Sequence, residues 1–136
     1  MNALCHAEKS QTPNMSSCVL VVEDHPPLRE LIAAVLGDAG YRVLAAGNGE
    51  EALRLARTST IDIILTDITL PDLQGPELAR RLRAESGHLR VVFMSGHDRE
   101  FVGAASDSHF LRKPFTPAAL RGMIATVLQP PPAHNV

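Results

Sequence analysis

Five short segments rich in apolar and β-branched residues predict β-strands. They cover residues 19–24, 41–46, 61–67, 91–96 and 109–113. In the first, third and fourth segments, apolar residues follow one another almost without the polar alternation expected of a strand that has one face in water. These three strands are therefore expected to be buried on both faces of a parallel sheet.

Between the strands, apolar residues recur at the i, i+3 and i+4 spacing of a helix. The first predicted helix has Pro27 in its first turn and ends near Gly40, and the second starts at a capping-box-like Asn48 and runs to about residue 57. Two others begin at Pro76 and Pro117. The residues expected to face inward are Leu28, Leu31, Ile32, Val35, Leu36 and Ala39 in the first helix, Leu78, Ala79 and Leu82 in the helix after Pro76, and Leu120, Met123, Ile124 and Val127 in the last.

One more helix is expected between the fourth and fifth strands, although little chain is left for it. Residues 98–106 could form nine helical residues, about 13 Å in length, with Gly103 weakening the middle. We therefore predict five helices, of which the fourth is short. Strands that alternate with helices in this way indicate a doubly wound α/β domain.

Polar side chains stand where the predicted strands end. The first strand ends on Glu23 and Asp24, the third on Asp67 and the fourth on Ser95, and Lys113 closes the last. A lone aspartate at such a place commonly caps a turn, but ligands of open α/β sheets bind at this edge. Three clustered carboxylates imply a shared proton or a bound divalent ion. Oxygen ligands suit Mg²⁺, and a lysine and a hydroxyl beside the ion suit the oxygens of a phosphoryl group.

Four motifs in a fixed order resemble the receiver domain of two-component response regulators. The resemblance covers residues 18–128 and implies a flavodoxin-like fold, with a five-stranded parallel sheet in the order 2-1-3-4-5. Two departures are Glu23, where aspartate is commoner, and Phe110, where tyrosine is frequent. The motifs are V-V-E-D at 21–24, L-T-D-I-T-L-P-D-L-Q-G at 65–75, M-S-G-H at 94–97 and K-P-F at 113–115.

The resemblance assigns a role to each residue at the sheet edge. Asp67 would be the phosphoacceptor, and Mg²⁺ would bind to Glu23, Asp24, Asp67 and the backbone carbonyl of Thr69. Lys113 would hold another oxygen of the phosphoryl group. The implied activity is that of a signalling switch and not of an enzyme, with self-phosphorylation from a donor and self-dephosphorylation only.

Further residues of the same edge would respond to phosphorylation or limit its lifetime. By the resemblance, Ser95 is the switch hydroxyl, Phe110 the switch aromatic, and Thr69 and His97 occupy positions that tune dephosphorylation. Because Lys113 must be aimed back toward the site from a strand end, we also predict a cis peptide bond between Lys113 and Pro114. The expected partner is a histidine kinase or a histidine phosphotransfer protein, and a homodimer could form through the fourth helix, last strand and last helix.

Composition adds limits to this picture. The 136 residues suffice for one domain, preceded by a disordered leader at 1–17 and followed by a proline-rich disordered tail at 129–136. A formal charge of −2 gives no electrostatic reason to expect nucleic-acid binding, and the basic run at 80–83 fits a solvated helix face. No apolar run approaches the length of a membrane span, and residues 1–17 lack the pattern of a secretory signal. The two cysteines fit a reducing compartment. We therefore expect a cytoplasmic protein.

Three alternatives to a phosphoryl-accepting switch compete for the same residues. A phosphohydrolase of the haloacid-dehalogenase type also uses an aspartyl phosphate, but it requires an acid two residues after the nucleophile, where this chain has Thr69. A flavodoxin-like flavin carrier requires a phosphate loop after the first strand, where Pro26 and Pro27 remove backbone donors. An interaction module that works without phosphorylation would not need the complete set of site residues.

Overall fold

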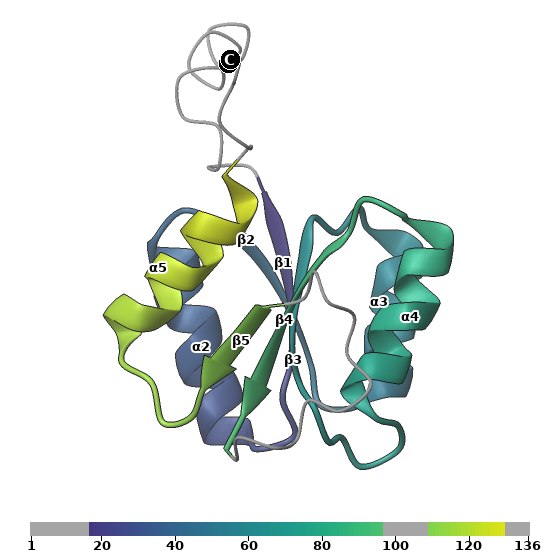
Figure 1. Cartoon of the computed structure of the whole chain (residues 1–136), viewed down its shortest axis with the longest axis horizontal. Coiled ribbons are helices and arrows are strands. Elements are labelled where there is room, and N and C mark those ends of the chain that lie inside the picture. Colours follow the sequence, from purple (N-terminus) through teal and green to yellow (C-terminus); the bar gives the residue numbers. More distant parts are fainter. Residues whose placement is uncertain (1–16, 97–108, 130–136) are drawn as a thin grey trace, which may run out of the picture.

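The computed structural model describes residues 17–96 and 109–129 and shows a five-stranded parallel sheet (Figure 1). The strand order is β2-β1-β3-β4-β5, as predicted. The doubly wound, flavodoxin-like arrangement is therefore confirmed. The strands are β1 (Cys18–Val22), β2 (Arg42–Ala46), β3 (Ile63–Asp67), β4 (Arg90–Ser95) and β5 (His109–Arg112).

Helices cover both faces of the sheet (Figure 1). Within the described ranges there are four: α2 (Pro26–Asp38), α3 (Gly49–Thr58), α4 (Gly75–Glu85) and α5 (Pro117–Leu128). The structure thus supports four of the five predicted helices. The short fourth one was placed at residues 98–106, which lie outside the described residues, as do most of the predicted leader and tail.

Two apolar cores lie on either side of the sheet, because successive side chains of a strand point to opposite faces. Leu20 and Val22 of β1 pack in the core beneath α3 and α4, whereas Val19 and Val21 pack in the core beneath α2 and α5. All five β1 residues are fully buried. This explains why the sequence of a central strand shows a continuous apolar run.

Three of the four described helices start with proline in the first turn, and two have a side-chain cap. The Asn48 Oδ1 accepts a hydrogen bond from the Glu51 N–H at 2.8 Å. In a capping box the Glu51 carboxylate would bond back to the N–H of Asn48. Here Glu51 Oε1 accepts instead from the N–H of Gly47 at 2.9 Å, so the reciprocal bond is shifted by one residue.

Three local expectations were wrong. Leu31 is 52% exposed, because at the helical spacing it lies about 120° from the direction midway between the buried Ile32 and Leu36. Ala39 is exposed because it is the C-cap and follows the end of α2. The third strand begins at Ile63 and not at residue 61. Asp62 instead accepts a hydrogen bond on Oδ2 from the Cys18 N–H at 2.7 Å, at the opposite edge from the strand's carboxyl end.

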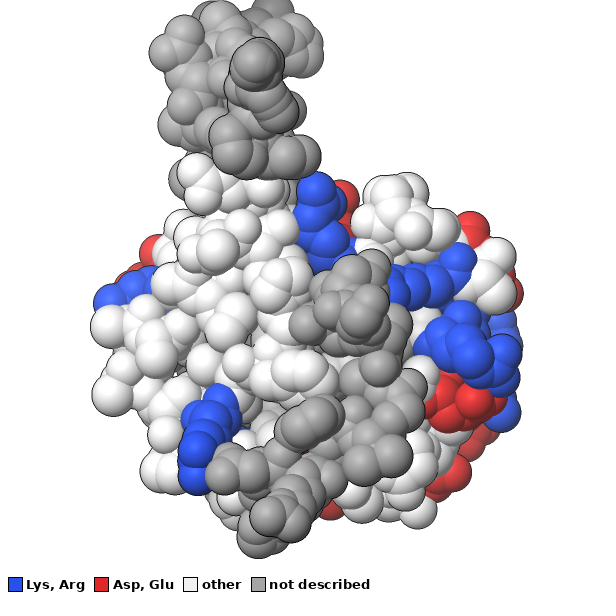
Figure 2. Space-filling model, in the orientation of Figure 1, with Lys and Arg blue, Asp and Glu red and all other residues white. Residues whose placement is uncertain are grey.

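Other local expectations are confirmed. The Lys113–Pro114 peptide bond is cis. Arg80 and Arg81 lie on the solvated face of α4 and pair with Glu77 at 2.6 and 2.9 Å. Figure 2 shows basic and acidic side chains intermixed on the right-hand side of the molecule. Among the helices of residues 17–96 and 109–129, none is long and apolar enough to cross a bilayer.

Candidate functional site

Parallel pairing brings the carboxyl ends of the central strands to one edge of the sheet. Val22 is paired with Thr66, so Glu23 and Asp67 follow on neighbouring strands. Glu23 is 1% exposed and Asp67 7% exposed, whereas Asp24 is exposed. One carboxylate oxygen from each of these three residues lies within 4.8 Å of the other two. The three predicted carboxylates therefore form one cluster that is open to solvent on the Asp24 side.

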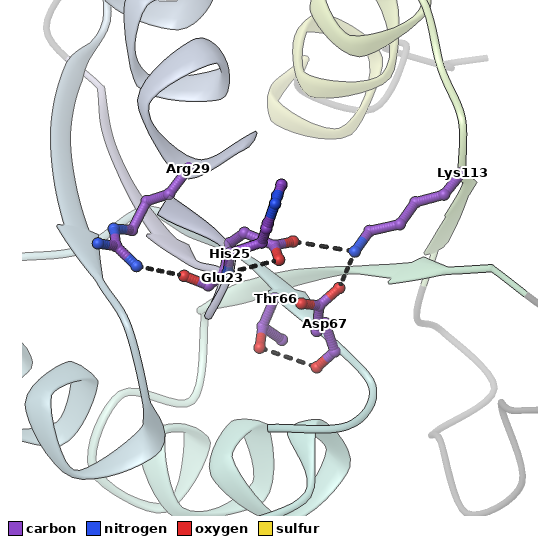
Figure 3. A network of polar contacts seen from close by, with 6 residues as sticks. All are labelled: Glu23, His25, Arg29, Thr66, Asp67 and Lys113. Atoms are coloured by element: carbon purple, nitrogen blue, oxygen red, sulfur yellow. Dashed lines mark hydrogen bonds and ion pairs between the residues drawn. The ribbon is translucent and has the colours of Figure 1, made fainter. Parts of the chain in front are cut away.

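Lys113 reaches this cluster from the end of β5 (Figure 3). Its Nζ lies 2.7 Å from Asp67 Oδ1 and 3.0 Å from Glu23 Oε1. The Lys113 backbone N–H donates to the carbonyl oxygen of Ser95 at 2.8 Å, which fixes the start of the side chain. Ser95 is buried at the end of β4 and is joined to Lys113 by this backbone bond, so it lies at the same sheet edge as the other four residues.

Backbone contacts hold Glu23 in place. The His25 N–H donates to Glu23 Oε2 at 3.1 Å, and Arg29 Nη1 donates to the Glu23 carbonyl oxygen at 2.8 Å (Figure 3). Arg29 lies in α2 and was missed by the sequence reasoning. Nothing in its helical spacing indicates that it turns toward the strand end, because the contact depends on how α2 packs on the sheet.

Two buried carboxylates share one lysine, and their pKa values move in opposite directions. Burial, the largest cause, and the neighbouring Glu23 together raise the pKa of Asp67 to about 7, against the hydrogen bond from Lys113, which lowers it. Burial also opposes ionisation of Glu23, but hydrogen bonds with Asp67 and Lys113 outweigh it and hold the pKa of Glu23 below its ordinary value. The hydrogen bonds to Asp67 and Glu23 raise the pKa of Lys113 despite its burial. Near neutral pH the pair therefore retains part of one proton.

The retained proton shows that the cluster lacks positive charge, and this bears on whether these residues fit a metal ion. A proton is held because one lysine does not neutralise two buried carboxylates. A divalent cation beside Glu23, Asp24 and Asp67 would supply the missing positive charge, and three carboxylates are hard oxygen ligands of the kind that such ions prefer. The donor set and its charge thus fit a divalent cation.

Close packing of the next helix holds the Asp67 backbone. A Cβ atom on Gly75 would lie 2.2 Å from the carbonyl oxygen of Asp67, so only glycine fits at the start of α4. The same carbonyl accepts a hydrogen bond from Thr66 Oγ1 at 3.0 Å. In the sequence Gly75 only closes the motif at 65–75, and its closeness to the Asp67 backbone cannot be seen from that motif.

The remaining candidates lie around this cluster. Thr69 is exposed and forms an isolated antiparallel bridge with Gln74. Phe110 is 36% exposed, and its ring centroid lies 5.6 Å from that of Phe93. His97 lies outside the described residues. Asp72 lies in the loop after β3, and both its carboxylate oxygens accept backbone N–H groups from the start of α3.

Comparisons with known proteins agree with this geometry. Over 122 residues, the chain is 31% identical to the alkaline phosphatase synthesis transcriptional regulatory protein PhoP of Bacillus subtilis, covering 85% of the chain and 50% of that regulator. The solved receiver domain of the hybrid histidine kinase CckA superposes with a TM-score of 0.72 at 35% identity, over 83% of this chain and all of that one. The response regulator TrrA of Thermotoga maritima, in complex with Mg²⁺ and BeF, superposes with a TM-score of 0.71 at 27% identity, over 82% of this chain and 99% of that one.

The curated relatives are longer than the matched region. The chain spans half the length of PhoP and about a tenth of the sensor histidine kinases that it also matches. The shared part is the receiver module, whose family description matches residues 19–125. With the fold, the strand order and this match in agreement, the chain belongs to the response regulator receiver domain family of two-component systems.

Proposed function

We propose that this receiver domain is a switch that accepts a phosphoryl group on Asp67 from a phosphohistidine of a histidine kinase or a histidine phosphotransfer protein. The observation that carries the proposal is the cluster of Glu23, Asp24 and Asp67 within 4.8 Å, with Lys113 Nζ only 2.7 Å from the Asp67 carboxylate. The cluster combines a nucleophile, a cation and an oxygen-rich metal site at one sheet edge.

In the proposed reaction, a carboxylate oxygen of Asp67 attacks the phosphorus atom. An O–P bond forms, the P–N bond to the donor imidazole breaks, and the imidazole nitrogen keeps the electron pair and takes up a proton. Lys113, 2.7 Å from the Asp67 carboxylate, would neutralise charge on a phosphoryl oxygen, and Ser95, buried at the end of β4, would donate a hydrogen bond to another. Mg²⁺ held by Glu23, Asp24, Asp67 and the Thr69 carbonyl would supply the further positive charge that a phosphoryl group requires.

The proposed response involves Ser95 and Phe110. Phe110 lies on β5, with its ring against Phe93 and partly exposed. We expect Ser95 to close on the phosphoryl group and Phe110 to turn inward, which would change the surface formed by β5, α5 and the helix predicted at 98–106. That surface is the one through which a homodimer would form.

We propose that two further residues affect how fast water hydrolyses the acyl phosphate. Thr69 is short and exposed, two residues after the acceptor, and would leave a path for an attacking water molecule. His97, two residues after Ser95, would orient or block that water. The role of His97 stays a prediction.

The proposal is tested by incubating the full chain with a small acyl phosphate and Mg²⁺. We expect the intact mass to increase by one phosphoryl group, the increase to disappear when a chelator removes Mg²⁺, and hydroxylamine to release the group, because an acyl phosphate is cleaved by that nucleophile. Absence of the modification, or a modification that resists hydroxylamine, would contradict an aspartyl phosphate.

Mg²⁺ binding should depend on pH in a direction that the Asp67 pKa determines. Because that pKa is raised to about 7 without metal, a proton competes with the ion below this pH. The apparent affinity should fall about tenfold from pH 8 to pH 6 and change little above pH 8. Calorimetric titrations in buffers of different ionisation enthalpy should show proton release that approaches one per ion at pH 6. Affinity that stays constant between pH 6 and pH 8 would show that Asp67 is not a ligand with this pKa.

A further inference from the structure

The loop that leaves Asp67, residues 68–74, is closed at its base, is anchored in the core by Ile68 and Leu70, and is held at its tip by a neighbouring helix. At the base, the Gly75 N–H donates to the Ile68 carbonyl at 2.6 Å, and Thr69 pairs with Gln74 in an antiparallel bridge. A closed loop of this kind moves as a unit. Its position relative to the rest of the site therefore depends on these core contacts and on what holds its tip.

The tip is held by the first turn of α3. Asp72 Oδ1 accepts the Gly49 N–H at 2.8 Å, and Asp72 Oδ2 accepts the Glu50 N–H at 2.9 Å. These N–H groups have no partner inside the helix, and the bond from Gly49 is the main reason that the pKa of Asp72 lies below its ordinary value. Leu73 packs so closely that a Cβ on Gly49 would lie 2.4 Å from Leu73 Cδ2.

The same turn of α3 is connected to the other half of the site. Glu51 Oε1 accepts the Gly47 N–H at 2.9 Å. Arg29 Nη1 lies 3.0 Å from the position that a Cβ on Gly47 would take, so the guanidinium lies beside this residue. Arg29 Nη1 in turn donates to the Glu23 carbonyl at 2.8 Å (Figure 3). The start of α3 thus touches the loop after Asp67 through Asp72, and the backbone of Glu23 through Arg29.

We propose that Asp72 is a positioning residue of the phosphoryl-acceptor site, which fixes the loop 68–74 relative to the strand end that carries Glu23 and Asp24. The inference rests on the proposed function, because it assigns Asp72 to the geometry of that metal site. Asp72 is not among the residues proposed to hold the ion or the phosphoryl group. Its two hydrogen bonds set where the Thr69 carbonyl and the Asp67 backbone lie relative to the carboxylates of the first strand.

The matched control is Asn48, which caps the same helix end without touching the loop. Its Oδ1 takes the Glu51 N–H at 2.8 Å, so Asn48→Ala also removes a cap from α3. The experiment measures Mg²⁺ affinity by isothermal titration calorimetry at pH 8 for the full chain, Asp72→Ala, Asp72→Asn and Asn48→Ala, together with thermal unfolding in a chelator. We expect both alanine variants to unfold at a lower temperature, but only Asp72→Ala to bind Mg²⁺ about tenfold more weakly.

The Mg²⁺ affinities of these variants distinguish a positioning role of Asp72 from a purely structural one. Asp72→Asn keeps one acceptor for the Gly49 N–H, so its affinity should lie between those of the wild type and Asp72→Ala, and it carries the test if Asp72→Ala does not fold. Wild-type affinity in either Asp72 variant, or an equal loss in Asn48→Ala, would overturn the positioning role and reduce Asp72 to a cap of α3. A wild-type chain that binds no Mg²⁺ would instead contradict the proposed function itself, and with it this inference.

Discussion

Replacement of Asp67 with asparagine should reduce labelling by a small acyl phosphate about 100-fold or more. Asparagine fills nearly the same space at the end of β3, but its amide oxygen is not the carboxylate nucleophile that the reaction requires. Labelling is measured by intact mass after incubation with the phosphodonor and Mg²⁺. Equal labelling of the variant and the wild type would show that another residue accepts the group.

The matched control is Asp62→Asn, just before the opposite end of the same strand. Asp62 accepts the Cys18 N–H on Oδ2 at 2.7 Å, and an asparagine oxygen can still accept that bond, so labelling should stay within about twofold of the wild type. A loss of labelling in Asp62→Asn as large as in Asp67→Asn would mean that the assay reports a general disturbance of β3.

Unfolding measurements without metal show whether Asp67→Asn loses labelling because it lacks the nucleophile or because it no longer folds. Because the pKa of Asp67 is raised to about 7, the folded state holds more protons than the unfolded state between about pH 4 and pH 7, so this group makes folding less favourable as pH rises through that range. Asp67→Asn should therefore match the wild type near pH 4 and exceed it by about 1 kcal/mol at pH 8, with allowance for solvent screening. A variant less stable than the wild type at pH 8 would contradict this.

The sheet and the edge residues were predictable because one physical rule links them. Strands buried on both faces and separated by helices are typical of a parallel sheet, and the carboxyl ends of parallel strands meet at one edge. Once the runs ending at Asp24, Asp67 and Ser95 were recognised, the proximity of their side chains followed. Lys113 was predictable in the same way, because it follows the last strand at the same edge.

The contacts that fix this edge could not be predicted in the same way. Arg29 and Asp72 have ordinary local explanations, a helix surface and a turn, and their partners are set by the packing of helices on the sheet. The partner of Asp72 lies 23 residues away in sequence at Gly49. Leu31 is the opposite case, a residue for which the sequence predicted a contact that the structure lacks. Its spacing fits the inward-facing side of a helix, but the orientation of α2 leaves it 52% exposed. Periodicity predicts a face of a helix but not the angle at which that face meets the sheet.

Replacement of Gly75 with alanine should destabilise the fold by about 3 kcal/mol and slow labelling of Asp67 about tenfold. The added Cβ would lie 2.2 Å from the Asp67 carbonyl oxygen and 3.1 Å from the Ile68 Cα. Both contacts are with backbone, which cannot rotate away as a flexible side chain can. The start of α4 must therefore move, and the 2.6 Å hydrogen bond from the Gly75 N–H to the Ile68 carbonyl is strained with it. Denaturant unfolding measures the first effect, and the initial rate of labelling the second.

Gly122→Ala is the control, in which the same substitution should stabilise the fold instead of destabilising it. Gly122 lies within α5 (Pro117–Leu128) and has no atom within 4 Å of the position its Cβ would take. Alanine there removes the entropic cost of glycine in a helix, so this variant should gain about 0.5–1 kcal/mol and label at the wild-type rate. If Gly75→Ala also gained stability, α4 would not pack against the Asp67 backbone as closely as the structure shows. A loss of stability at an unchanged labelling rate would mean instead that the packing supports the fold without positioning the acceptor.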